Sequence, residues 1–299
     1  MSKISTAIKT ISDPGKFIYS MGRNGLLNWL PDELYLKILF RAKKGTDLNL
    51  SNPITFNEKL QWLKLYDRNP RYISLVDKIT AKEVVAKLIG SEHIVPIYGT
   101  WKNASEIDFE LLPNQVVLKC NHDQGSVVII DNLQQFDINK ATEFLNKKLK
   151  RSPYPGSREY AYSQIKPMVF AEKYLGSSII DYKFYCFNGV PKFLYCGKGL
   201  TSDHSLKIDF FDMNWHLMPF YRTDYERLGE IECPTHFEEM KKIALKLSKG
   251  IPFVRIDLFE VDNIVYFSEF TLCPAAGYMP FVPEEYDKIV GSWLELPKK

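Results

Sequence analysis

The chain has 299 residues, of which 45% are hydrophobic, 25% charged and 14% aromatic, a composition that excludes disorder over most of its length. Its formal net charge of only +3 gives no sign of nucleic-acid binding, although it suits a polyanionic small ligand or an anionic membrane surface. Five cysteines without a CxxC pair and scattered histidines argue against a disulfide framework and a zinc site, and no apolar run is long enough to span a membrane.

The first 50 residues mix apolar and basic positions at helical spacing. Asp13-Pro14-Gly15 interrupts this pattern, and Pro31-Asp32-Glu33 is typical of a helix start. Two interpretations are open, a membrane-surface helix or a helical arm packed on its own domain, and we favour the packed arm. The N-terminus lacks a secretory signal pattern, so we expect a cytoplasmic protein.

Helical spacing over 56–66 and 73–89 predicts two helices. In the second segment the clearer helical pattern begins at Asp77 and Lys78. A short strand is expected over 94–100. A continuous apolar run then begins at residue 115, which predicts a buried strand. The polar turn NHDQGS and the run VVII follow it and complete a hairpin.

A lysine-rich helix is expected over 137–150, and a polar loop with proline and glycine over 151–164, which we expect to be mobile. Asn188-Gly189 predicts a hairpin turn, and residues 236–249 form an amphipathic helix pattern. The remaining strands are predicted over 168–174, 182–187, 191–196, 207–212, 253–259 and 264–271. The sequence therefore predicts an α+β fold with largely antiparallel sheets and a helical N-terminal region.

The hairpin over 253–271 carries the strongest chemical signal. If it turns about Asn263, Asp257 lies directly opposite Glu269, and Arg255 points to the same face. Two carboxylates in such a pair repel unless a hard cation such as Mg²⁺ lies between them. An arginine beside a cation suits a phosphoryl group that is being transferred. The alternative is a solvent-facing hairpin with unrelated charges.

Lys119 ends a buried strand, and the turn up to Ser126 follows it. Such a lysine and the backbone N–H groups of a Gly/Ser turn can surround phosphates, although the turn could also simply join two strands. His122 in this turn is either a proton donor or phosphate contact, or a surface residue. The strand end at 172–175 could hold an adenine ring or be an ordinary charged edge strand.

Taken in order, these segments resemble the ATP-grasp superfamily, whose fold holds ATP between two α+β subdomains. The chain is most similar to the TupA-like branch, linked to teichuronopeptide and capsular-polysaccharide biosynthesis. The phrases that carry the resemblance are FNEKLQWLKLYDRNP (56–70), LVDK (75–78), LPNQVVLKCNH (112–122), DYKFYCFNGVPKF (181–193), FVRIDLF (253–259) and PEEYD (283–287).

The resemblance implies a helical region over 1–70 and an ATP-grasp domain over 71–299. Within that domain it implies a small nucleotide-lid subdomain over about 110–172 and a metal-binding subdomain over about 173–299. The bound cofactors it implies are ATP and Mg²⁺. The nucleotide-binding positions it implies are Lys78, Lys119, Asn121, His122, Gly125, Ser126, Glu172, Lys173, Leu175, Asp181 and Lys183.

Arg255 and Lys119 are the catalytic residues that the resemblance implies, and Asp257, Glu269 and Thr271 are the magnesium ligands. The family commonly has Glu-x-Asn at the second metal strand, whereas this chain has Glu269-Phe270-Thr271. The resemblance implies that residues 121–126 form a flap over the phosphates, and this segment is less rich in glycine than is usual in the branch. Both departures leave a non-catalytic ATP-binding module as one possibility.

The implied activity is an ADP-forming carboxylate–amine ligase that works through an acyl phosphate on a surface polysaccharide or its precursor. A glycosyltransferase or a sugar kinase of polysaccharide biosynthesis is the alternative. The implied partners are an acidic small molecule or glycan and an amine. The low net charge gives no nucleic-acid partner, and the location we expect is the cytoplasm, at the inner face of the membrane, with peripheral membrane contact through the N-terminal region. The first 70 residues and 197–235, with His204, Tyr221, Arg222 and Tyr225, are expected to shape the substrate pocket.

Overall fold

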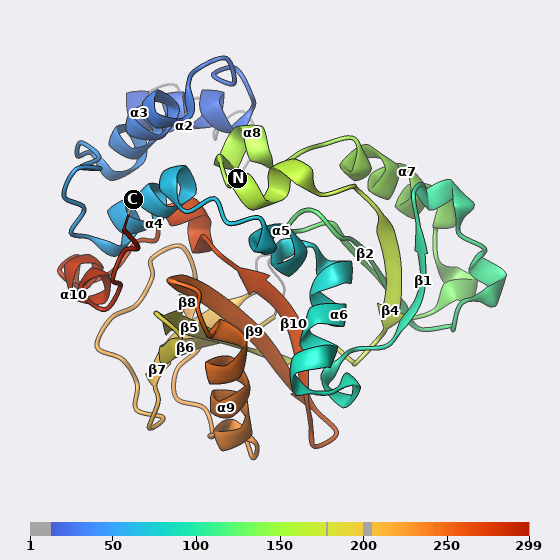
Figure 1. Cartoon of the computed structure of the whole chain (residues 1–299). Coiled ribbons are helices and arrows are strands. Elements are labelled where there is room, and N and C mark those ends of the chain that lie inside the picture. Colours follow the sequence, from blue (N-terminus) through green and yellow to red (C-terminus); the bar gives the residue numbers. More distant parts are fainter. Residues whose placement is uncertain (1–12, 178, 200–204, 299) are drawn as a thin grey trace.

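A computed structural model describes residues 13–177, 179–199 and 205–298 of the chain. Two sheets with helices around them form the molecule (Figure 1). The smaller sheet has four strands in the order β1-β4-β2-β3, and every pair in it is antiparallel. These strands are β1 (Ile97–Trp101), β2 (Val116–Cys120), β3 (Val127–Ile130) and β4 (Val169–Lys173).

The larger sheet has six strands in the order β10-β9-β5-β6-β7-β8, and only the short β7–β8 pair is parallel. Its strands are β5 (Ile180–Phe187), β6 (Val190–Lys198), β7 (Lys207–Asp212), β8 (Glu226–Arg227), β9 (Phe253–Val261) and β10 (Ile264–Thr271). Asn188 and Gly189 both have positive φ angles, 48° and 83°, as a two-residue hairpin turn requires. The predicted antiparallel α+β architecture is confirmed.

Most helices agree with the sequence patterns, although residues 154–157 of the predicted loop are helical, the helix over 286–292 was not predicted, and two further patterns need correction. The helices are α2 (Pro14–Arg23), α3 (Asp32–Lys44), α4 (Phe56–Tyr66), α5 (Arg71–Val76), α6 (Lys78–Ile89), α7 (Ile138–Leu149), α8 (Tyr154–Ser157), α9 (Phe237–Ser248) and α10 (Tyr286–Ser292). The pattern over 73–89 is two helices, because Asp77 has extended backbone angles and caps α6. Asp13-Pro14-Gly15 starts α2, since Asp13 caps it and Pro14 is its first residue.

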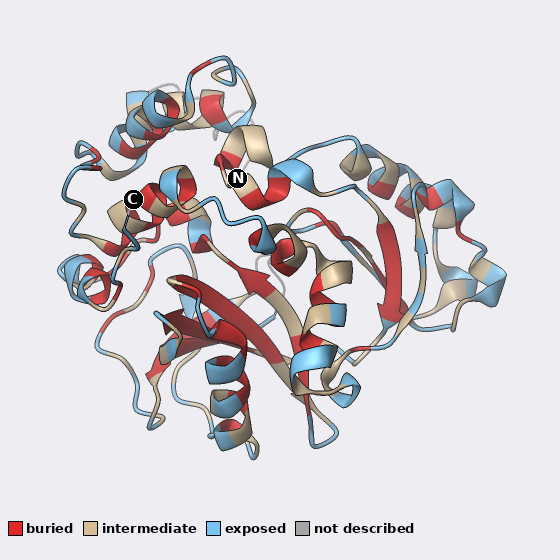
Figure 2. Cartoon of the chain, viewed as in Figure 1, coloured by how far each residue is buried: buried red, intermediate tan, exposed pale blue. Residues whose placement is uncertain are grey.

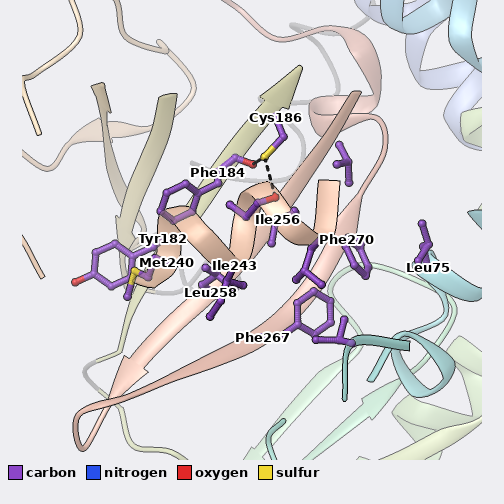
Figure 3. Packing of buried hydrophobic residues seen from close by; sticks show 14 of the residues in the cluster. Leu75, Tyr182, Phe184, Cys186, Met240, Ile243, Ile256, Leu258, Phe267 and Phe270 are labelled. Atoms are coloured by element: carbon purple, nitrogen blue, oxygen red, sulfur yellow. Dashed lines mark hydrogen bonds between the residues drawn. The ribbon is translucent and has the colours of Figure 1, made fainter. Parts of the chain in front are cut away.

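Both faces of the six-stranded sheet are buried, because alternate residues of β5 belong to hydrophobic clusters on opposite sides. The central strands of this sheet are coloured mostly as buried in Figure 2. Tyr182 and Phe184 pack with Met240 and Ile243 of α9 on one face (Figure 3), and the same cluster continues to α5 and α6 beside β10. Tyr185 and Phe187 lie on the other face, in an aromatic cluster with Phe56 of α4. Burial on two faces explains why these strands read as continuous apolar runs.

The N-terminal helices pack on the rest of the chain. Tyr35, Leu39 and Phe40 of α3 are buried in one cluster with Trp62 of α4 and Tyr278. The packed arm is therefore the correct interpretation for residues 13–50, while residues 1–12 lie outside the described part. Among the described helices, none is both long enough and apolar enough to cross a bilayer.

The segment 151–164 contains α8 and is tied to the N-terminal helices. Arg158 is buried with its guanidinium 4.2 Å from the ring centre of Tyr35, and it donates hydrogen bonds to the carbonyls of Asn28 and Leu30. The Tyr35 hydroxyl donates to the carbonyl of Gly156 at 3.1 Å. These contacts fix the path of the segment, and its mobility stays a prediction.

Asn57 fastens the C-terminal helix α10 to α4. Its backbone N–H and side-chain amide both donate to Asp287, and its side chain also exchanges hydrogen bonds with the backbone of Met279. Asn57→Ala removes these side-chain bonds in a buried site and is expected to lower the free energy of unfolding by about 3 kcal/mol. Urea unfolding measures this loss. The exposed Asn52→Ala is the control, and equal midpoints for the two variants would contradict the prediction.

Candidate functional site

The N-terminus of α6 is fastened to the turn at 121–126, which we call the flap. The Asp77 carboxylate caps α6 through the N–H of Ile79 at 2.9 Å, and it also accepts from the Asn121 side chain at 3.0 Å. The Lys78 backbone N–H donates to the Asn121 carbonyl, and the Lys78 Nζ donates to the Asp123 carbonyl at 2.5 Å. The capped end of α6 therefore holds Lys78 directly against the flap.

The β9–β10 hairpin places Asp257 opposite Glu269, as predicted. The turn differs from the one assumed, because Asp262 and Asn263 together form it with φ angles of 52° and 61°. That two-residue turn alone would pair Asp257 with Ser268. The register shifts by one residue at Ser268, and this β-bulge brings Glu269 opposite Asp257.

Asp257 is fully buried and lies among cations. Arg255 donates from Nε to Oδ1 at 2.7 Å and from Nη2 to Oδ2 at 2.6 Å, and Lys183 donates to Oδ2 at 2.6 Å. Lys183 also lies 3.3 Å from a carboxylate oxygen of Asp181. Burial by itself would lower the pKa of Lys183, but Asp181 and Asp257 raise it above its usual range. Lys183 therefore stays charged.

Glu269 is the more accessible acid of the facing pair, since its side chain is 21% exposed and that of Asp257 is 0% exposed. Lys78 Nζ lies 3.2 Å from one Glu269 oxygen, and Arg255 Nη2 lies 3.5 Å from the other. Burial alone would raise its pKa, but Lys78, Lys183 and Arg255 lower the pKa of Glu269 to about 2. Arg255 Nη2 also donates to the Thr271 hydroxyl at 2.9 Å, so the three predicted metal positions surround one arginine.

A second charged group lies on the four-stranded sheet. Glu172 of β4 forms ion pairs with Lys119 of β2 and with Lys82 of α6, the latter at 3.1 Å. Burial alone would raise the pKa of Glu172, but Lys119 and Lys82 lower it. Sequence reasoning missed Lys82. Its position four residues after Lys78, on the same helix face, was the available signal.

Helix α6 therefore links the two sheets (Figure 1). Lys78 contacts Glu269 on the six-stranded sheet, and Lys82 contacts Glu172 on the four-stranded sheet. The sequence-predicted lysines and acids except Lys173 thus belong to two groups of ion pairs, one on each sheet, and α6 contributes one lysine to each group.

The remaining flap residues have structural contacts of their own. His122 is buried, with its Nε2 2.9 Å from the Arg151 carbonyl, and its Nδ1 has no partner among the described residues. The Ser126 hydroxyl donates to the Asp123 carboxylate. Gly125 has a φ of 86° and faces open space, so glycine is needed there for its backbone conformation.

The strand end at 172–175, which is predicted to hold the adenine ring, already has partners for some of its polar groups. The N–H of Lys173 donates to the Pro96 carbonyl at 2.9 Å, and the carboxylate of Glu172 is taken up by lysines. Leu175 follows the end of β4. β4 lies between β1 and β2 and pairs with both, so the prediction of an edge strand is wrong, and the N–H of Lys173 is occupied as well.

We call the two groups of ion pairs beside α6 the charged site. A large open cleft of about 1070 Å³ adjoins it. It reaches the site through Asp123 and through Cys273, two residues beyond Thr271. Residues expected to shape a substrate pocket do line it, including Arg222, Tyr225 and members of the N-terminal helices. Tyr221 is not among them, and His204 lies outside the described residues. The cleft is lined by residues within 19–28, 43–44, 123–124, 148–162, 222–225 and 273–280.

Several solved structures are similar to this chain. The chain is similar to D-alanine–D-alanine ligase from Bacillus anthracis in complex with ATP, at 16% identity and a TM-score of 0.41, over 73% of this chain and 63% of that one. It is also similar to L-amino acid ligase from Bacillus licheniformis, at 12% identity and a TM-score of 0.45, over 77% of this chain and 50% of that one. The alignments thus span less than two thirds of those chains. No curated protein matches.

A protein-family model described as TupA-like ATPgrasp matches residues 58–295, which include both sheets and every residue of the charged site. That match leaves only the N-terminal helices and the last four residues outside. The chain belongs to the TupA-like ATP-grasp family.

Proposed function

We propose that this protein is an ATP- and Mg²⁺-dependent carboxylate–amine ligase that releases ADP. The observation that carries the proposal is the pair of lysines on α6, Lys78 and Lys82, which joins the acids of one sheet to those of the other. Family membership supports a nucleotide at this junction. The junction offers several fixed cations to phosphates, and electrostatic stabilisation by fixed charges is the main contribution that phosphoryl transfer needs from a protein.

The residues fit a magnesium ion that shares its ligands with a nucleotide. Among the described residues, no group of three or more His, Cys, Asp or Glu side chains is arranged to hold a metal. Asp257 and Glu269 form a facing pair, and Mg²⁺ in phosphoryl-transfer sites is commonly held by one or two carboxylates together with phosphate oxygens and water. When bound, Mg²⁺ would neutralise the charge that develops on the phosphates.

The lysines differ in what they can reach. The side chain of Lys119 is 19% exposed and that of Lys82 is 5% exposed, although both contact Glu172. Lys119 is therefore the member of that pair that can turn to a phosphate, while Lys82 stays as the counter-ion of Glu172. Lys78 and Lys183, both beside the metal-binding acids, supply the remaining positive charge.

The proposed reaction has two steps. A substrate carboxylate attacks the γ-phosphorus of ATP, which expels ADP and forms an acyl phosphate. An amine then attacks the acyl carbon and expels phosphate. Arg255, held in place by Asp257 and Thr271, is positioned to stabilise the negative charge that develops in both steps. The flap and the segment 151–164 are proposed to keep water from the acyl phosphate.

The substrate and the location are part of the same proposal. Family membership supports an acidic glycan or glycan precursor of the cell surface as the acid, and an amino acid or another amine as its partner. A cytoplasmic enzyme at the inner face of the membrane would meet such precursors. The exposed side chains of Phe17, Leu26 and Trp29 on the N-terminal helical region support peripheral membrane contact.

Trapping with hydroxylamine tests the reaction. With ATP, Mg²⁺ and a panel of uronic acids and amino acids, we expect ADP release and an acyl hydroxamate, because hydroxylamine intercepts an acyl phosphate. ADP with a phosphorylated sugar and no hydroxamate would identify a sugar kinase. Transfer from a nucleotide sugar without ADP from ATP would identify a glycosyltransferase. If a fluorescent ATP analogue does not bind, the proposal is wrong at its first step.

A further inference from the structure

The cleft beside the charged site has a separate set of cations. None of the ion-paired lysines or acids at the junction of the sheets lines it. Its cations are Arg23 and Lys43 from the N-terminal helices, Lys44, Lys148 and Arg151 at the end of α7, and Arg222. Its acids are Asp123, Glu159 and Asp224, so positive charge exceeds negative charge.

Two of these cations are neutralised and four are not. Arg222 makes a two-bond contact with Asp224, and Lys44 lies 3.3 Å from Asp287. Within the described part of the chain, no carboxylate lies within ion-pair distance of the other four, and two of those contact aromatic rings. These four are Arg23, Lys43, Lys148 and Arg151. Two acids of the cleft, Asp123 and Glu159, likewise have no ion pair among the described residues, so the four cations, which come from two distant parts of the chain, leave an excess of two positive charges.

We propose that this cleft binds the acid substrate through a phosphate group that the substrate carries in addition to its reacting carboxylate. This inference rests on the proposed function, because the cleft opens onto that site through Asp123 and Cys273. A lone carboxylate needs one cation, whereas an excess of two positive charges, carried by four side chains, suits a phosphate with its charge of about −2 and its several oxygens. Arginine in particular matches phosphate geometry with two parallel hydrogen bonds. Arg23 and Lys43 lie outside the family match, so the N-terminal helices select this group.

Calorimetric titration without ATP tests the proposal. The probes are glucuronic acid 1-phosphate and glucuronic acid, and the phosphate ester is expected to bind about tenfold more tightly. In Arg23→Gln/Lys43→Gln this preference is expected to fall to about one. Lys16→Gln/Lys37→Gln removes the same charge from the same two helices outside the cleft, and it is expected to keep the preference.

Equal affinities of the two probes for the wild-type protein would overturn the proposal, as would failure of the ester to bind. A preference that survives in Arg23→Gln/Lys43→Gln would place the phosphate elsewhere and would also overturn it. UDP-glucuronic acid distinguishes a nucleotide-linked source from a free sugar phosphate. Lys119→Ala separates this inference from the proposed function, because it is expected to abolish binding of the ATP analogue and to leave the preference for the ester unchanged.

Discussion

Glu269→Gln is expected to lower the rate of ATP-dependent ADP release by about a thousandfold, with whichever acid the enzyme turns over. Glu269 is the exposed member of the facing acid pair and contacts both Lys78 and Arg255. The amide keeps the size of the side chain but loses the charge that a magnesium ion needs. Steady-state assays at several Mg²⁺ concentrations measure the effect, and higher Mg²⁺ is expected to restore part of the rate.

Glu260→Gln is the matched control for this change. Glu260 lies on the same hairpin and pairs with His236 at 2.8 Å, away from the charged site. It is expected to keep wild-type turnover, and circular dichroism at the assay temperature checks that both variants are folded. If Glu269→Gln turned over at the wild-type rate, Glu269 would not be part of the site.

Glu172→Gln is expected to lower the free energy of unfolding by about 3–5 kcal/mol, because it leaves the buried Lys82 without its counter-ion. Lys119 loses the same partner but is more exposed and can reach water. Urea or thermal unfolding at neutral pH measures the change. Glu143→Gln, an exposed position on α7, provides a control that is expected to unfold as the wild type does.

The effect of Glu172→Gln should depend on pH in one direction. Burial alone would raise the pKa of Glu172, but Lys119 and Lys82 hold it below the value of 4.5 that a free glutamate shows. The stabilisation is therefore fully present above about pH 4.5 and is lost as the pH falls through the lower pKa of the folded state. The two proteins should differ less at pH 3 than at pH 7. A difference that grows in acid would contradict this account of Glu172.

The facing pair of Asp257 and Glu269 shows how a correct prediction can depend on a feature that the sequence does not reveal. The alternation of the two strands and the polar residues between them predict a hairpin. A two-residue turn alone would have paired Asp257 with Ser268, and the bulge at Ser268 restores the predicted pair. Bulges arise from twist and packing in the whole sheet, so a local pattern does not specify them.

Lys82 is the opposite case, a site residue that the sequence did not single out. Its type and spacing are ordinary for an exposed helix position, yet it is 4% exposed and neutralised by a residue 90 positions later in the chain. Only the packing of α6 between the two sheets makes it a counter-ion. The cleft cations are similar, since Arg23 and Lys43 read as surface charges until the fold sets them in one cleft with Lys148 and Arg151.

Short-range patterns were sufficient for most helices and strands, the hairpin at Asn188-Gly189 and the α+β class, because each of these depends on the periodicity or turn chemistry of neighbouring residues. They did not give the short elements α8 and β8 or the helix α10. The motif phrases were sufficient for the family. The ion pairs that connect the sheets and the charge of the cleft were decided by the tertiary structure alone. They join side chains far apart in the sequence, whose energies depend on burial and distance, and neither quantity exists before the chain has folded.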